Sequence, residues 1–441
     1  MTNDRHSSNA ARDNAISEIN AARTGAYARG APMWEKRELS SEHLEERQKK
    51  SGVDVPFMVL TLIILMLGVI MVLSASFARA FYTSGQPMQI FMRQLVFAVS
   101  GVAIMLVVSR ISVRTLSRWS LYLAIVSIAL LVLVLVIGVK VNGARRWIGV
   151  GSGNSSFTFQ PSEIVKLALI MSFAQMSCKF GKKMRTFKYG VMPFMGMTAV
   201  IVILLGREPH ISASVIIVAL AVIMMFAGGV RLKWFVLAGL VIALLAGALY
   251  VTYIRPSSKE KTDLNADLQQ AVSDNSGRLG YAGGRISAWL DPESDPLGSG
   301  LQIRQSLFAV GSGGVFGQGL GQSRQKYLYL PEEHNDYIFA IVCEELGFIG
   351  AMLILVLFVL LIIRGYWLAL HARDKYGSLI TIGITSLLAI QVFLNVAVVT
   401  NLLPATGISL PFFSYGGTAL WIQLLQIGII LSVSREIPVK G

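Results

Sequence analysis

Charged residues are scarce in this sequence, which excludes an ordinary soluble domain. Lys, Arg, Asp and Glu make up 15% of the 441 residues, whereas 54% are hydrophobic. Soluble domains carry about 25% charged residues. Apolar stretches recur along the chain, and each is long enough to cross a bilayer core of about 30 Å. A β-barrel would instead show alternating segments of about ten residues, so the sequence predicts an all-α polytopic membrane protein.

Cysteine and a secretory signal are two further absences. Cys178 and Cys343 are the only cysteines, and two isolated cysteines form neither a disulfide framework nor a metal cluster. We interpret both as small core residues. The first 50 residues are polar and charged, so the first apolar span is expected to direct its own membrane insertion.

Ten membrane-spanning helices are predicted, with both termini in the cytoplasm. In this orientation the inner loops are rich in Arg and Lys, as the positive-inside rule requires. The same rule explains the net charge of +14 without a nucleic-acid partner. The inner loops are 110–118, 178–190, 229–233 and 364–377. The spans are predicted near 55–76, 90–109, 119–138, 161–177, 191–206, 211–228, 234–254, 337–363, 378–401 and 411–433.

The membrane domain is predicted to extend over 55–435, between two cytoplasmic tails. Residues 1–54 mix both charges with Ser, Asn and Ala and are expected to be disordered. Residues 436–441 form a short C-terminal tail. One outward-facing loop, 255–336, is far longer than the others. It contains eight Lys or Arg and ten Asp or Glu, so it is slightly acidic in a basic protein.

Polar residues gather at the predicted outer ends of the spans, where a charge in lipid is costly unless it is paired. Glu163 and Lys166 lie three residues apart on one helical face and can pair. This pair would either fix helix packing or belong to a site at the outer membrane surface. For Glu344 and Glu345 a packing or capping role is favoured over chemistry. Further members of the set are Arg93, Gln94, Arg207 and Glu208.

Two adjacent arginines in a predicted outer loop break the positive-inside trend. Arg145 and Arg146 precede Trp147 in the loop 139–160. Guanidinium groups suit phosphate oxygens, and tryptophan suits the headgroup layer. The predicted partner is therefore membrane lipid with an anionic, phosphorylated head, and a simple interfacial anchor is the alternative.

The long acidic loop contains the stretch DPESDPLGSG at 291–300, whose prolines and glycines fix an irregular backbone. A carboxylate held there, such as Asp295, could accept a proton from a sugar hydroxyl as a general base. It could also cap local N–H groups in an Asx turn. His334 and Asp336 lie at the mouth of the eighth span and could bind metal, relay protons or cap the helix. The glycine-rich 311–323 lacks a Rossmann strand and Walker lysine spacing, which excludes a nucleotide site.

Several motifs, in the right order, resemble those of the SEDS family, the FtsW, RodA and sporulation-type cell-wall proteins. The stretch NVAVVTNLLPATGISLPFFSYGGTAL, at 395–420, is similar to the C-terminal signature of that family. GARRWI, FQPSEIVKLA, DPLGSG, GQGLGQS and LPEEHNDYIFAIVCEELG match as well, and the resemblance covers about 55–435. The signature residues are Asn395, Pro404, Gly407, Pro411, Ser414, Gly416 and Gly417.

The resemblance implies a peptidoglycan glycosyltransferase in the cytoplasmic membrane, working at its outer face. Its substrate would be lipid II, an undecaprenyl-pyrophosphoryl disaccharide-pentapeptide. Its partners would be a class B penicillin-binding protein, which is a transpeptidase, and other division or elongation proteins. The essential acidic residue of the family falls on Asp295, which we predict to be the catalytic base that accepts the proton of the acceptor 4-hydroxyl.

Roles for the remaining candidates follow from the same resemblance. The leaving group is a lipid pyrophosphate whose charge must be stabilised. Candidates to bind pyrophosphate or sugar are Arg145, Arg146, Glu163, Lys166, His334, Asp336 and Ser414. Structural or partner-binding roles are expected for Arg93, Glu344, Glu345, Pro404, Gly416 and Gly417. No protein-bound cofactor is predicted; a divalent cation on the pyrophosphate stays open, because no ligand cluster is evident and arginines could neutralise the charge.

A lipid flippase and a non-catalytic scaffold are the alternatives. A transporter should carry polar groups near the bilayer midplane on broken helices, whereas here they crowd the outer edge. A scaffold would tolerate the loss of Asp295. One departure from the family is REPHISAS at 207–214, which puts any role of His210 or Ser212 in doubt. The 50-residue tail and SYGGTAL favour a division protein at the septum over elongation or sporulation types.

Overall fold

The fold is a bundle of long helices that corresponds to a multi-pass membrane protein. The computed structural model describes residues 52–141, 144–150, 157–208, 211–249, 278–296 and 298–437. Within these ranges eight helices are long and apolar enough to cross a membrane, and α9 is a shorter apolar helix. The long helices are α3 (Val55–Ser84), α4 (Gln89–Val108), α5 (Val113–Ile137), α6 (Pro161–Phe180), α8 (Met192–Arg207), α9 (Ile211–Ala227), α10 (Leu232–Leu249), α14 (Ile338–His371), α15 (Lys375–Val399) and α16 (Gly417–Arg435).

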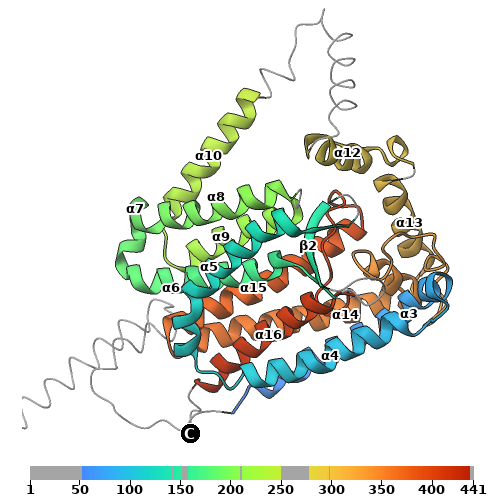
Figure 1. Ribbon diagram of the computed structural model, residues 1–441, viewed down its shortest axis with the longest axis horizontal. Helices are drawn as coiled ribbons and strands as arrows, with labels where there is room; N and C mark the ends of the chain where they lie inside the picture. The colour runs from blue at the N-terminus through green and yellow to red at the C-terminus, as the bar shows by residue number, and fades with distance from the viewer. Residues whose placement is uncertain are drawn as a thin grey trace, which may run out of the picture.

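The helices pack in neighbouring pairs around a shared apolar core. α4 lies along α16, α5 along α6, and α14 along α15 (Figure 1). α6, α15 and α16 are the most enclosed of the candidate spans. α10 extends away from the bundle (Figure 1). Each of the ten predicted spans overlaps one of these helices, but only eight helices in the described ranges are long and apolar enough to span a membrane, so the count of ten stays a prediction. Residues 1–51 of the predicted tail 1–54 and residues 255–277 of the long loop lie outside the described residues.

The chain enters and leaves the bundle at the same end. Asp54, which caps α3, forms a two-pronged ion pair with Arg364 at 2.6 and 3.1 Å. The backbone N–H of Asp54 also donates to the hydroxyl of Ser434, near the end of α16. Glu436 accepts a hydrogen bond from the N–H of Val113 at the start of α5. The turn before α5, which contains Arg110, therefore lies beside both ends of the membrane domain.

The all-α prediction is wrong in one place, because the loop at 139–160 forms a small antiparallel sheet. Strands β1 (Val139–Val141), β2 (Ala144–Val150) and β3 (Phe157–Phe159) are ordered β1-β2-β3. Val139 pairs with Trp147, and Ile148 pairs with Phe159. Alternating β-branched and aromatic residues favour strand pairing here. The sheet gives a fixed position to Arg146, which the sequence placed in an irregular loop.

The long loop is also more regular than predicted. Its described part holds α12 (Arg278–Leu290), the 3-10 turn η4 (Pro292–Ser294) and α13 (Ser299–Ser312). α12 is anchored on the segment between α15 and α16, because Trp289 donates to the carbonyl of Asn401 and Arg285 to that of Ala405, at 3.0 and 2.6 Å. Two short elements, η2 (Gly181–Arg185) and α7 (Phe187–Gly190), connect α6 to α8.

The last helix begins at Gly417, six residues later than the predicted start at 411. Pro411 has no N–H to donate, and Phe412 has a φ of +64°, which ends any helical path. Gln423 accepts the N–H of Phe412 at 3.0 Å, so the irregular backbone is satisfied by a side chain. Gly68 of α3 lies against this segment: an added Cβ would meet the carbonyl oxygen of Phe412 at 2.3 Å. The segment 411–416 is therefore packed inside the bundle.

A second irregularity breaks α14 at Gly347, whose φ of +67° is not helical. The loop after α13 fills the break. The carbonyls of Glu344 and Glu345 accept the N–H groups of Gln318 and Gly319, each at 3.0 Å. The N–H of Phe348 donates to the carbonyl of Gly314 at 2.9 Å. Backbone groups released by the break thus find partners in the loop, as membrane-embedded backbone must.

Candidate active site

A cavity of about 1210 Å³ lies at the end of the bundle opposite the Asp54–Arg364 pair. Its wall combines charged side chains with apolar ones. Segments remote in sequence form it, among them the ends of α3 and α4, β2, the start of α6, α12, the loop before α14, and the segment between α15 and α16. The charged wall residues are Arg79, Arg93, Arg146, Glu163, Lys166, Arg285, Glu332, His334 and Asp336.

The loop His334-Asn335-Asp336 is held by its backbone, which aims two side chains at the cavity. Each of its three carbonyls accepts a hydrogen bond. Tyr415 N–H donates to His334 at 2.9 Å, and the Ser414 hydroxyl donates to Asn335 at 2.8 Å. The Asn395 amide donates to Asp336 at 2.7 Å. Because the backbone is fixed on three sides, His334 and Asp336 are preorganised on the cavity wall.

The hydroxyl of Ser414 is therefore occupied by hydrogen bonds within the protein. It donates to Asn335 and accepts the N–H of Leu410 at 2.7 Å. Gln94 of α4 supports the same turn: it donates to the carbonyl of Ser414 at 3.4 Å and accepts the N–H of Gly416 at 3.3 Å. Ser414 lines the cavity as predicted, but its hydroxyl is engaged in holding the loop.

An ion pair that the sequence did not predict supports the same loop. Arg79, at the far end of α3, donates two hydrogen bonds of 2.7 Å to Glu333. Glu333 is fully buried, and the Nδ1 atom of His334 lies 3.4 Å from its Oε1 atom. Burial acts to raise the pKa of Glu333, but the nearby His334 and the two hydrogen bonds from Arg79 outweigh it and lower that pKa. Glu333 therefore stays charged beside Arg79.

The predicted pair Glu163–Lys166 exists, with a distance of 2.7 Å between Nζ and Oε1. Both side chains are buried at the start of α6 and line the cavity. Arg93 lines it from α4 and Arg146 from β2. Arg146 also donates to the carbonyl of Glu208 at 3.4 Å. Cationic side chains thus border the cavity from three separate elements, which suits a substrate with phosphate groups.

Asp336 is the carboxylate whose proton affinity the cavity changes most clearly. Burial, together with nearby Glu332, raises its pKa to about 6, although Arg285, Arg146 and His334 oppose the shift. A carboxyl group with a pKa near neutrality is suited to exchanging protons with a substrate. The sequence left the role of Asp336 open.

Asp295 does not line the cavity in this structure. Its Oδ1 atom accepts the N–H of Gly298 at 3.0 Å, and its Oδ2 atom accepts that of Ser299 at 2.6 Å. The carboxylate therefore caps the start of α13. Of the two roles that the sequence left open, the capping role is the one this geometry displays, and the general-base role stays a prediction.

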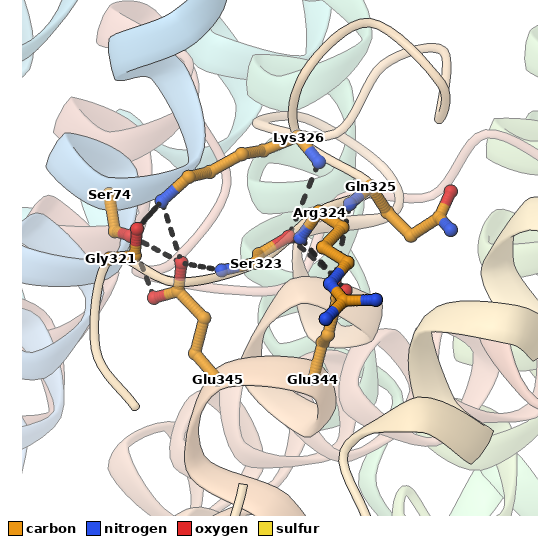
Figure 2. Close-up of polar contacts among 8 residues, drawn as sticks. All are labelled: Ser74, Gly321, Ser323, Arg324, Gln325, Lys326, Glu344 and Glu345. Carbon is orange, nitrogen blue, oxygen red and sulfur yellow. Dashed lines mark hydrogen bonds and ion pairs between the residues drawn. The ribbon is translucent and has the colours of Figure 1, made fainter. Parts of the chain in front are cut away.

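Glu344 and Glu345 belong to a separate buried cluster (Figure 2). Glu345 pairs with Lys326 at 3.0 Å and accepts the hydroxyl of Ser74 at 2.7 Å. Glu344 accepts the N–H of Arg324 at 2.9 Å and the hydroxyl of Ser323. The cluster joins α3, the broken α14 and the loop between α13 and α14, and these contacts are of the kind that a packing role requires.

Of the remaining predicted residues, some line the cavity and others do not. Gly416 and Gly417 line the cavity, and a Cβ at Gly417 would meet the Phe97 ring at 2.3 Å. Pro404 does not line it. Arg145 lies in β2, and its side chain is outside the described atoms; His210 is outside the described residues.

The sequence analysis missed Arg79 and Arg285. It ended the first span at 76, although no breaker precedes Gly85, which ends α3 with a φ of +67°. Continuing the helix would have placed Arg79 on it. Arg285 lies in a glycine-containing stretch that was treated as loop, and only its docking on Ala405 gives it a place on the wall.

Comparisons with known proteins agree with this arrangement. Residues 55–438 match the FtsW/RodA/SpoVE family, described as cell cycle proteins. The chain is 42% identical to stage V sporulation protein E of Bacillus subtilis, over 88% of this chain and 98% of that protein. It is 38% identical to the "probable peptidoglycan glycosyltransferase FtsW" of Trichlorobacter lovleyi, over 91% of this chain and 98% of that protein.

Two solved structures share the fold. One is a chain of a peptidoglycan synthase complex that coordinates polymerization and crosslinking; it has a TM-score of 0.66 and 25% identity and covers 87% of this chain and 98% of its own. The other is the rod shape determining protein RodA of Thermus thermophilus, with a TM-score of 0.60, 24% identity, and coverage of 88% and 98%. The chain belongs to the FtsW/RodA/SpoVE family, also called the SEDS family.

Proposed function

We propose that this protein is a peptidoglycan glycosyltransferase that polymerises lipid II in the cavity described above. The observation that carries the proposal is the cavity itself: cationic side chains from four elements, Arg79, Arg93, Arg146 and Arg285, border one space beside membrane-spanning helices. Such a space suits a substrate with an anionic head and a lipid tail. Relatives named as peptidoglycan glycosyltransferases support the same reaction.

The reaction transfers the growing glycan from its lipid pyrophosphate to the sugar of a second lipid II. The acceptor 4-hydroxyl attacks the anomeric carbon from the side opposite the leaving group, so the configuration inverts and a β-1,4 bond forms. Arg146, Lys166 and His334 are the proposed partners of the departing pyrophosphate. Glu163 holds Lys166 in place at 2.7 Å.

A metal ion held by the protein does not fit the described residues. Among them, no group of three or more His, Cys, Asp or Glu side chains could hold one. A divalent cation in this reaction would have to be bound mainly by the pyrophosphate oxygens of the substrate. We assign neutralisation of the leaving group to the arginines and derive no step through a metal.

Asp295 is proposed to be required for polymerisation, as the motif implies. Purified protein, combined with its class B penicillin-binding protein carrying a blocked transpeptidase serine, should form labelled glycan strands from lipid II. Asp295→Asn should abolish strand formation while partner binding and folding persist. If both proteins form strands equally, Asp295 is only a turn residue. If neither forms strands where a control polymerase does, the proposed activity is wrong.

The cellular setting completes the proposal. We propose ten spans with both termini in the cytoplasm, because Arg110 in the turn before α5 and Arg114 in its first turn lie at the end where the domain begins and ends. The cavity then faces outward. A class B penicillin-binding protein is the proposed partner, beside other division proteins at the septum. The identity to a sporulation protein keeps a sporulation role as the second candidate.

One observation favours lipid transport as a second activity. α14 is broken at Gly347, and broken helices are typical of transporters. The break is, however, filled by hydrogen bonds from the 314–319 loop. Reconstituted vesicles with fluorescent lipid II would report any transport, and movement at the rate of a control flippase would support this alternative.

A further inference from the structure

Exposed cations gather at the end of the bundle opposite the cavity, on the connection from α6 to α8 and on the turn between α9 and α10. This basic patch consists of Lys182, Lys183, Arg185, Lys188, Arg231 and Lys233. We propose that it binds the head group of an anionic phospholipid, whose acyl chains lie along the adjoining surface of α8 and α10. The inference concerns a separate surface and does not depend on the proposed glycosyl transfer.

Two helices place the basic patch at the membrane surface. α6 begins beside the cavity, where Glu163 lines it, and ends at Phe180; α9 begins beside the cavity, where Ser212 lines it, and ends at Ala227. Because a helix rises 1.5 Å per residue, Glu163 and Phe180 lie about 25 Å apart along α6. The bilayer core is about 30 Å thick. The patch therefore lies at the opposite membrane face from the cavity, which is the cytoplasmic face in the orientation proposed above.

In the described part of the chain, no carboxylate pairs with the basic patch. None of its six side chains forms an ion pair with another described residue. The sequence has no Asp or Glu between Glu163 and Glu208, and none between Glu208 and Glu260. The positive-inside rule explains why cations lie at this face, but it does not require them to share one folded surface. Their charge is thus available to an external anion.

Packing contacts join the two segments that carry the patch. The ring of Phe187 in α7 lies 4.9 Å from that of Trp234 in α10, measured between centroids. Each of these rings has a lysine of the patch as its neighbour in the chain. At the turn after α9, a Cβ added to Gly228 would lie 2.6 Å from the hydroxyl oxygen of Ser177 in α6. The turn is therefore packed closely against the end of α6, and the two sets of cations form one surface.

Aromatic rings hold three of the lysines. The Nζ atoms of Lys183 and Lys188 lie 5.5 and 5.9 Å from the centroid of the Tyr189 ring. The Nζ atom of Lys233 lies 4.8 Å from that of the Trp234 ring. A cation–π contact orients an ammonium group without neutralising its charge, and Tyr and Trp rings favour the head-group layer of a membrane. The three ammonium groups are therefore held at the depth of the lipid phosphates.

An exposed apolar surface adjoins the patch and distinguishes a lipid from a soluble acidic protein. Met192 and Met195 of α8 are exposed, as are Leu232 and Val236 at the start of α10. α10 extends away from the bundle beyond this point (Figure 1). Exposed apolar residues of a membrane protein contact acyl chains, and basic pockets between membrane helices bind anionic head groups. A phospholipid satisfies both parts of the surface, whereas an acidic soluble protein would satisfy only the cations.

The test measures lipid binding to the purified full chain by native mass spectrometry in a mild detergent. The probes are phosphatidylglycerol, which is anionic, and phosphatidylcholine, which has no net charge. Each lysine near an anionic lipid surface contributes roughly fivefold in affinity. Wild type should therefore bind phosphatidylglycerol at least about tenfold more tightly than phosphatidylcholine. The triple variant Lys183→Gln, Lys188→Gln, Lys233→Gln should reduce this preference to within about twofold.

The matched control removes the same charge from the same end of the bundle, outside the patch. Arg110→Gln, Arg114→Gln, Arg118→Gln changes three exposed arginines at the start of α5 and should keep the preference. An equal loss in both triple variants would mean that binding follows total charge, which overturns the proposal. A preference unchanged in the lysine variant overturns it as well. Melting temperatures in phosphatidylcholine report whether each variant is folded.

Photocrosslinking to wild type locates the lipid without any substitution. A phosphatidylglycerol with a photoactivatable head group should form adducts within 182–190 and 231–236. Adducts confined to other segments would refute the site. If wild type shows no preference for phosphatidylglycerol, the lipid proposal is wrong, and an acidic protein becomes the partner whose chemistry fits the basic patch. Neither measurement uses polymerisation, so its outcome is separate from that of the proposed function.

Discussion

The side-chain amide of Asn395 donates to two carbonyl oxygens at once, those of Asp336 and Ile408, each at 2.7 Å. One buried side chain thus joins the loop before α14 to the segment before α16. These two segments carry His334, Asp336 and Ser414 to the cavity. The geometry of the cavity wall therefore depends on a residue that does not line it.

Replacing Asn395 with leucine should destabilise the protein and reduce polymerisation. Each carbonyl left without a donor costs about 1–3 kcal/mol when it is buried. Thermal unfolding in detergent measures the first effect and strand synthesis the second. Gln318→Leu, which removes an exposed hydrogen bond to Ser312, is the control and should change little. An unchanged melting temperature for Asn395→Leu would contradict the proposed link.

The Lys326–Glu345 pair should behave as a coupled unit. Removing one partner leaves a buried charge without compensation, which typically costs about 3–5 kcal/mol. Lys326→Met and Glu345→Gln are therefore each expected to lower the melting temperature strongly. The double variant should lose less than the sum of the two. Simple additivity in a double-mutant cycle would mean that the 3.0 Å contact contributes no coupling.

Gly347→Ala should unfold the loop that fills the break in α14. An added Cβ would lie 2.2 Å from the backbone nitrogen of Gly317, and the φ of +67° is itself unfavourable for alanine. Gly196→Ala is the matched control, because nothing lies within 4 Å of a Cβ there. The control should be neutral or slightly stabilised. Limited proteolysis of the 314–330 segment would detect release of the loop in Gly347→Ala.

The buried carboxyl group of Glu208 should make the stability of the folded protein depend on pH. Burial raises its pKa from 4.5 to about 8, and Arg146 only partly opposes this. Because the folded state favours the protonated form, the stabilisation is complete below 4.5 and is lost as the pH rises through about 8. Glu208→Gln removes this dependence. The difference in melting temperature between Glu208→Gln and wild type should therefore grow from pH 6 to pH 9; a constant difference would refute the shift.

The sequence analysis predicted the helices well and the breaks in them poorly. Long apolar runs identify spans without knowledge of their neighbours, and each predicted span falls on a helix. The irregular segment 411–416 was assigned to a helix because its residues are apolar. The segment stays non-helical because side chains from other parts of the chain form hydrogen bonds with its backbone and with that of the preceding residues. These side chains are Gln94, Gln423 and Asn395.

The candidate site divides in the same way. Glu163 and Lys166 were predicted to pair because three residues of helix bring them together, and they do so at 2.7 Å. Arg79 and Glu333 lie 254 residues apart, so no local pattern could pair them. The carboxylate of Asp295 could be read as a base or as a cap; its contacts with Gly298 and Ser299 show the cap, and the role as a base stays a prediction.

The sequence by itself determined that this chain spans a membrane and to which family it belongs. It also showed which charged residues lie at the ends of apolar spans. Hydropathy and motifs are local properties of the chain, so they can be read without the fold. Only the tertiary structure decided which of those residues face a common space. Whether a charged side chain can bind a substrate or only stabilises the fold depends on the residues it contacts. Buried ion pairs such as Arg79 with Glu333 and Lys326 with Glu345 join separate segments of the chain. Burial and through-space electrostatics, which set the proton affinity of Asp336, exist only once the fold has brought β2, α12 and the loop before α14 together.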